Sequence, residues 1–116
     1  MEKIKNRWIE NKEKGYNCFG CAPHNPFGLH LEFYRDGEEL LAHWQPHINF
    51  QSWVNVVHGG IQSTMLDEIG GWLVNDELDT CGVTTRIETK FLKPLLFSDG
   101  TIEIRAKLIK MIRNIA

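Results

Sequence analysis

A histidine followed by two glycines, His58-Gly59-Gly60, and a carboxylate nine residues after the histidine, Asp67, are suited to chemistry by type and spacing. If a helix begins at the glycines, their N–H groups have no partner within it and point outward, where the helix dipole adds partial positive charge. Such amides hold the oxygen of a polarised carbonyl. Asp67, about two turns further on, has the chemistry of a nucleophile or general base. Together these groups suggest acyl transfer, whereas a Gly-Gly before a helix is often only a turn and a helix Asp is usually solvated.

A helix starting at these glycines is predicted from the spacing of apolar residues. One helical face collects the following side chains: Ile61, Met65, Ile69, Trp72 and Leu73. Leu66 and Val74 lie off this face, so the helix is apolar around much of its surface, which is typical of a buried helix. We therefore expect a buried helix running to about Leu78, with Asp67 in apolar surroundings.

A second stripe of the predicted helix is small and polar. It consists of Gly60, Ser63, Thr64, Asp67, Gly70 and Gly71. Small residues allow a ligand or a neighbouring backbone to approach closely, so Ser63 and Thr64 are candidate substrate-binding residues. Each glycine inside a helix costs roughly 1 kcal/mol relative to alanine, which predicts a compensating contact.

Length and composition exclude several classes of protein. The 116 residues are expected to form a single domain, 1–116, and the net charge of −2 does not suggest nucleic-acid binding. No apolar run has the length of a membrane span, and the first ten residues lack the apolar core of a signal peptide. We expect a cytoplasmic protein without nucleic-acid or membrane partners.

The three cysteines, Cys18, Cys21 and Cys81, are an odd number and do not suggest a disulfide framework. The first two have the spacing of half a zinc site, with His24 and Cys81 as possible further ligands. No second Cys-x-x-Cys and no histidine pair at ligand spacing completes it. Reduced, packed cysteines are therefore the favoured interpretation, and we expect no metal and no cofactor.

The pattern of the rest of the sequence predicts an α+β protein in which an antiparallel sheet packs on the one long helix. Residues 2–13 are expected to form a short amphipathic helix or, equally, a frayed leader, and an irregular loop over 16–28 follows before the sheet. Alternating residues predict strands, which span 29–35, 39–45, 83–93 and 101–108, with a hairpin turn at Asp36-Gly37. Four strands leave exposed edges, and pairing with another subunit would cover them.

Four stretches of the chain resemble hotdog-fold acyl-CoA thioesterases of the PaaI-like group. They are Cys18-Phe-Gly-Cys21 with Asn25-Pro26-x-Gly28-Leu29, His58-Gly59-Gly60, Leu66-Asp67-Glu68 with Gly71, and Val83-Thr84-Thr85 through Phe91-Leu92-Lys93-Pro94. The resemblance implies a sheet wrapped around a central helix. It also implies a homodimer with a continuous sheet, often paired into a homotetramer. Because the family has at least one further strand after the point where this chain ends, with Met111–Ala116 leading into it, the resemblance implies a hotdog fold truncated at the C-terminus.

The same resemblance implies catalytic roles at a dimer interface and an acyl-CoA substrate. Asp67 would be the nucleophile or general base. The amide of Gly59 or Gly60 would polarise the thioester carbonyl, and His58 would shape the turn.

A Thr of the facing subunit would position water, and the two candidates are Thr84 by family spacing and Thr85 by strand alternation. Relatives often carry an Asn or Gln before the histidine that orients water or the carbonyl. Here Gln51 and Asn55 lie near, but Ser52 stands six residues before the histidine, where some relatives have Asn.

Thioester hydrolysis is thus the predicted function, and three alternatives stand beside it. A non-catalytic acyl-CoA or acyl-lipid binding module would use the same glycine amides with a structural Asp67. A hotdog dehydratase or hydratase needs a helix histidine, and none lies between Gly59 and Leu78. A small zinc-binding interaction module would bind stoichiometric zinc.

Overall fold

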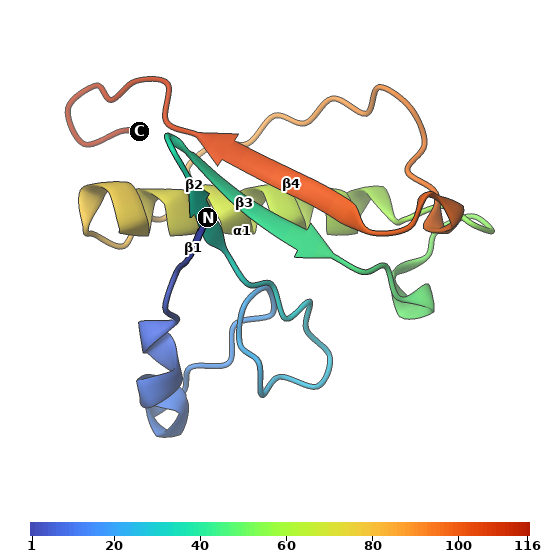
Figure 1. The fold of residues 1–116 in the computed structure, drawn as a ribbon, viewed down its shortest axis with the longest axis horizontal. Helices are drawn as coiled ribbons and strands as arrows, with labels where there is room; N and C mark the ends of the chain where they lie inside the picture. Colours follow the sequence, from blue (N-terminus) through green and yellow to red (C-terminus); the bar gives the residue numbers. More distant parts are fainter.

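The computed structural model describes residues 1–116 as one antiparallel sheet with a long helix against it (Figure 1). The four strands lie side by side in chain order: β1 (Glu2–Lys3), β2 (Tyr34–Asp36), β3 (Glu39–Trp44) and β4 (Ile102–Lys107). The helix is α1 (Gly59–Leu78), and three short 3₁₀ helices are η1 (Arg7–Lys14), η2 (Ile48–Phe50) and η3 (Phe97–Asp99). The α+β arrangement of the hotdog fold is confirmed. No helix combines the length and the hydrophobicity needed to cross a membrane.

The core lies between α1 and the inner face of the sheet. Met65, Ile69, Trp72 and Leu73 of α1 are buried, which confirms the predicted apolar face, and the Trp72 ring stacks on Phe33 at 5.1 Å between centroids. Full burial of each large apolar side chain contributes about 1.5–3 kcal/mol. The opposite face of α1 is not covered by the sheet, and Leu66 on that face is 39% exposed. The expectation of a helix buried around much of its surface is therefore wrong in this chain.

The β2–β3 hairpin and β4 follow the predicted alternation. Gly37, with φ of +60°, makes the turn after Asp36, as expected for this dipeptide. β3 and β4 pair antiparallel over their whole length, from Glu39 opposite Lys107 to Trp44 opposite Ile102. Side chains that face α1 are buried and their neighbours are exposed, as in β4.

The N-terminal half departs from prediction in two places. The first residues form β1 and the 3₁₀ helix η1 instead of an α-helix over 2–13, although Gly15 ends η1 as expected, with φ of +105°. Residues 29–33 keep the predicted alternation of buried and exposed side chains, yet only Tyr34–Asp36 forms a strand. Instead, the backbone amides of Leu29 and Leu31 donate to the carbonyls of Phe19 and Gly20 in the preceding loop, at 2.8 and 2.9 Å.

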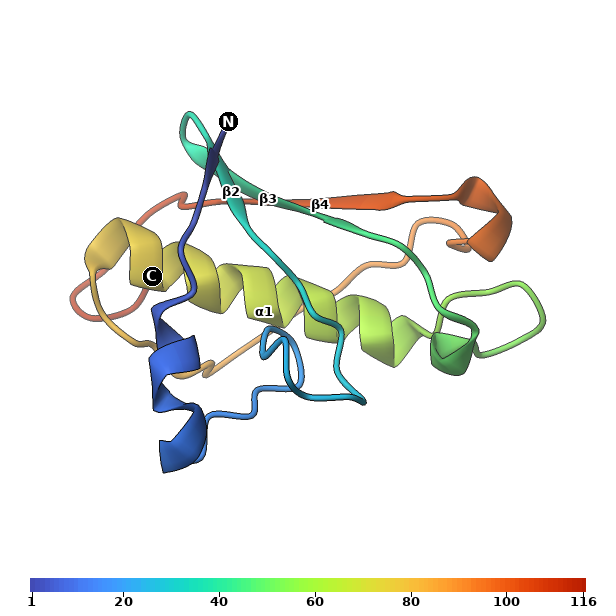
Figure 2. The ribbon, with the colours of Figure 1, turned by 60° about the horizontal axis from the view of Figure 1, so that its bottom comes forward.

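Residues 83–93 do not form the predicted strand. None of their backbone N–H or C=O groups takes part in a hydrogen bond within the chain. The segment returns from the end of α1 and passes alongside it (Figure 2), with the Ser63 hydroxyl donating to Thr89 at 3.3 Å. The period-two pattern needs a neighbouring strand to become sheet, and no other segment of the chain lies in that position.

Candidate functional site

The N-terminus of α1 is capped by the ring of His58. The Gly60 amide donates to Nδ1 of His58 at 2.9 Å, which requires the tautomer with an unprotonated Nδ1. The chain contains no acceptor for the Gly59 amide. Of the two amides expected to polarise a carbonyl, that of Gly59 is therefore the one left free. A Cβ placed on Gly59 would lie 3.4 Å from the Phe91 ring, so this ring packs beside Gly59.

Asp67 projects from the face of α1 that the sheet does not cover. It is exposed, and its Oδ1 accepts a hydrogen bond of 2.5 Å from the Thr84 hydroxyl. The expectation of apolar surroundings for Asp67 is therefore wrong in this chain, because the segment that carries Thr84 covers this face thinly and is itself exposed.

The structure separates the two threonine candidates. Thr84 contacts Asp67, whereas Thr85 is exposed and makes no side-chain hydrogen bond within the chain. The contact lies within one chain, while the resemblance implied a threonine of the facing subunit. Strand alternation, which favoured Thr85, does not apply here because the segment is not in a sheet.

Gly59 and Asp67 lie well apart along α1 within a single chain. Eight residues of helix separate them, which corresponds to about 12 Å along the axis. A carbonyl oxygen held at the Gly59 amide would have to be within about 3 Å of it, and the attacked carbon is one bond further. This separation favours a site in which the two groups come from different copies of the chain.

The other predicted substrate-binding residues are engaged in local structure. The Asn55 amide donates to Oε1 of Gln51 at 3.2 Å, and the Asn55 side chain bonds Ser98. Asn55 adopts a positive φ of 66°, so both residues hold the loop that leads into α1. The Thr64 hydroxyl donates back to the Gly60 carbonyl at 2.8 Å.

A comparison with models of known protein families shows to which family the chain belongs. Residues 54–116 match the Thioesterase superfamily. The chain belongs to this superfamily. Neither the curated proteins nor the solved structures gave a match. The matched region begins just before the helix cap and contains Gly59, Asp67 and Thr84, and membership indicates a thioester hydrolase in general.

The face of α1 around Asp67 is open. A Cβ placed on Gly70 or Gly71 would have no atom within 4 Å, so nothing in the chain compensates for these helix glycines. A separate cavity of about 610 Å³ lies beneath the N-terminal segment, lined in part by Ile4, Cys21 and Trp72. It does not include any residue of the Gly59–Asp67 region, and the open helix face is therefore the better candidate for the thioesterase site.

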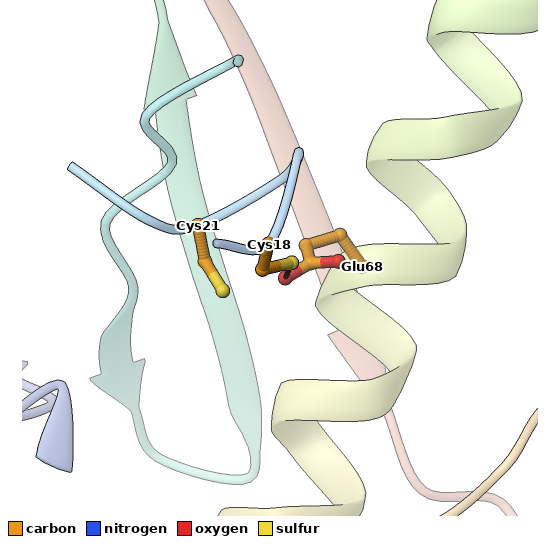
Figure 3. Close-up of side chains that lie close together, drawn as sticks. All are labelled: Cys18, Cys21 and Glu68. Atoms are coloured by element: carbon orange, nitrogen blue, oxygen red, sulfur yellow. Dashed lines mark hydrogen bonds between the residues drawn. The ribbon is translucent and has the colours of Figure 1, made fainter. Parts of the chain in front are cut away.

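Cys18, Cys21 and Glu68 form a second cluster of reactive side chains. Of these, only Glu68 lies within the matched region. Figure 3 shows Glu68 reaching from α1 toward the loop that carries Cys18 and Cys21. The two sulfurs and a Glu68 oxygen lie within 4.8 Å of one another, and the Cys18 thiol donates to Oε1 of Glu68 at 3.3 Å. Sequence reasoning missed Glu68 as a member of this cluster, because it lies 47 positions after Cys21.

The electrostatics of the two cysteines differ. The pKa of Cys18 is lowered to about 7, mainly because the Cys21 thiol donates a hydrogen bond to its thiolate. The pKa of Cys21 is raised, because it supplies that hydrogen bond, is buried, and faces the Glu68 carboxylate. Cys18 is therefore the more reactive of the pair. The other expected zinc ligands are elsewhere: His24 Nε2 bonds the Tyr16 carbonyl at 2.6 Å, and Cys81 is exposed.

Proposed function

We propose that this protein hydrolyses acyl-CoA-type thioesters, with Asp67 as nucleophile or general base. The observation that carries the proposal is the hydrogen bond from Thr84 to Oδ1 of Asp67, located in the region that matches the Thioesterase superfamily. This bond orients the carboxylate and leaves Oδ2 free to act. A charge-assisted hydrogen bond of this kind is about twice as strong as a neutral one.

The proposed site is shared between two copies of the chain. The axial separation of about 12 Å, at about 1.5 Å per helical residue, supports Gly59 of the partner subunit as the amide that faces Asp67. Two α1 helices that run antiparallel across a twofold axis would create two such sites. The uncovered glycines Gly70 and Gly71 support this arrangement, since they leave room for another backbone. A homodimer, or a dimer of dimers, is therefore part of the proposal.

In the proposed reaction, the carbonyl oxygen of the thioester accepts a hydrogen bond from the Gly59 amide. The negative charge that develops there is stabilised by this amide and by the positive end of α1. Asp67 either attacks the carbonyl carbon and expels the thiolate, leaving an anhydride that water then opens, or removes a proton from an attacking water. Both routes consume one water and yield a carboxylic acid and a thiol.

The test compares Asp67→Asn with Asp79→Asn. Asp79 ends α1 with φ of +50°, a conformation that Asn tolerates, so it is a matched change of charge on the same helix. Thiol release is measured from a panel of aliphatic and aromatic acyl-CoAs. We expect Asp67→Asn to lose about 10²–10⁴-fold in kcat and Asp79→Asn to match wild type. Full activity in Asp67→Asn would overturn the assignment.

A non-catalytic acyl-CoA or acyl-lipid binding module is the second candidate. The exposure of Asp67 favours it, because a solvated carboxylate carries no desolvation cost that a catalytic role must offset. Calorimetric titration with the same acyl-CoAs separates the two functions. Saturable binding without thiol release, in a sample shown to be dimeric, would establish the binding module.

A further inference from the structure

The loop before β2 presents two sulfurs to one carboxylate of α1. Cys21 is buried, Cys18 is half-buried, and both ligand atoms lie within 4.8 Å of Oε of Glu68. The Cys-x-x-Cys spacing lets both sulfurs face one point. Two thiolates and a carboxylate form a donor set that suits Zn²⁺, which takes Cys sulfur and Glu oxygen in tetrahedral sites.

The glycine between the cysteines makes room for the third donor. A Cβ on Gly20 would lie 2.4 Å from Cδ of Glu68, so any larger residue there would displace the carboxylate. Gly20 does not have a positive φ, so a glycine is needed there because the Glu68 side chain occupies the position of a Cβ. The loop is built so that Glu68 reaches the sulfurs.

Two further side chains orient the donors from outside. The Trp72 indole N–H donates to Oε1 of Glu68 at 3.1 Å, and the Tyr16 hydroxyl lies 2.9 Å from Sγ of Cys21. Hydrogen bonds of this kind fix the direction of metal ligands and tune their basicity. The cavity beneath the N-terminal segment reaches Cys21 and offers an ion a path of entry.

We propose that Cys18, Cys21 and Glu68 bind one Zn²⁺ ion, with water as the fourth ligand. Each cysteine loses its proton on binding, and the Tyr16 hydroxyl then donates its hydrogen bond to the Cys21 thiolate. The ion joins the loop over 16–28 to the middle of α1 and stabilises their packing. This inference does not depend on the proposed hydrolysis, because Cys18 and Cys21 lie outside the family match.

The experiment is a metal titration of the full chain, prepared metal-free under reducing conditions. Co²⁺ is added alone and followed by absorption, and Zn²⁺ is then added to displace it. We expect one Co²⁺ per chain, with the near-ultraviolet thiolate-to-cobalt charge-transfer band that Cys ligands produce. Absence of this band, or recovery of the two cysteines as a disulfide that excludes the ion, would overturn the proposal.

Four variants locate the site. Cys18→Ser should abolish the charge-transfer band, while Cys81→Ser, a change of an exposed cysteine, should leave it unchanged. Glu68→Gln preserves volume and Gly20→Ala preserves both cysteines. Each should weaken Zn²⁺ affinity by at least about tenfold, since even outer-shell changes at metal sites cost 10–100-fold. Circular-dichroism spectra establish that the variants are folded. A folded Glu68→Gln with wild-type affinity, or loss of the band in Cys81→Ser, would contradict the assignment.

Discussion

The Thr84 hydroxyl lies 2.5 Å from Oδ1 of Asp67 and donates a hydrogen bond to it. This bond joins the middle of α1 to a segment whose backbone makes no hydrogen bond of its own over 83–93. Together with the contact between Ser63 and Thr89, it holds the segment along the helix face. The orientation of the candidate catalytic carboxylate and the position of this segment are therefore coupled.

Thr84 and Thr85 offer a matched pair of substitutions to test this coupling. Thr84→Val removes the donor to Asp67, and hydrogen bonds to charged groups contribute about 1.5–3 kcal/mol. We expect kcat for thiol release to fall by about 10- to 100-fold, at 1.36 kcal/mol per factor of ten. Thr85→Val, at an exposed neighbour without such a bond, should match wild type. Equal effects of the two changes would show that Thr84 has no special role.

His58 is expected to contribute to stability through the cap of α1. Its Nδ1 accepts from the Gly60 amide, and loss of an N-cap acceptor costs about 0.5–2 kcal/mol. His58→Ala should lower the free energy of unfolding in urea by this amount, while His58→Asn, which keeps an acceptor, should lose much less. An alanine variant as stable as wild type would rule out the capping role.

Gly71 tests whether the open face of α1 packs against a second copy. Nothing in the chain approaches a Cβ placed there, so Gly71→Ala should stabilise the isolated chain by about 1 kcal/mol through helix propensity. In the proposed dimer the added methyl group meets the partner, and the dissociation constant should rise. Urea unfolding at low concentration and sedimentation equilibrium measure the two effects. A dimer as tight as wild type would place the interface elsewhere.

Cys18 should show a pH-dependent reactivity in the metal-free protein. Its pKa is lowered to about 7 by the hydrogen bond from Cys21, and the thiolate is the reactive form. Below pH 7 the thiol predominates and above it the thiolate, so the alkylation rate by iodoacetamide should rise through pH 7 and level off above it. Buried Cys21, with a raised pKa, should stay unmodified. Mass spectrometry of the peptide that carries both residues measures this, and a Cys18 rate that does not change between pH 6 and 8 would contradict it.

Much of the fold could be predicted because its patterns are local. The helix from Gly59 to Leu78, its apolar face and the turn after Asp36 follow from spacing and from the preferences of single residues. Apolar and polar residues alternate regularly in β3 and β4. The two strands pair along their whole length, because each supplies the other with a complete partner. The 3₁₀ form of η1 was not predicted, because its apolar spacing does not distinguish it from an α-helix.

By itself, the sequence determined the superfamily and part of the secondary structure: a helix that begins at Gly59, an Asp67 on its small-residue face, and a cysteine pair in the loop before β2. The tertiary structure decided which groups meet. It left residues 83–93 without a sheet partner, exposed Asp67, placed the Thr84 hydroxyl against Asp67, and brought Glu68 to Cys18 and Cys21. The physical reason is that a periodic pattern fixes which side of an element is apolar, whereas contacts between distant residues depend on how the elements pack.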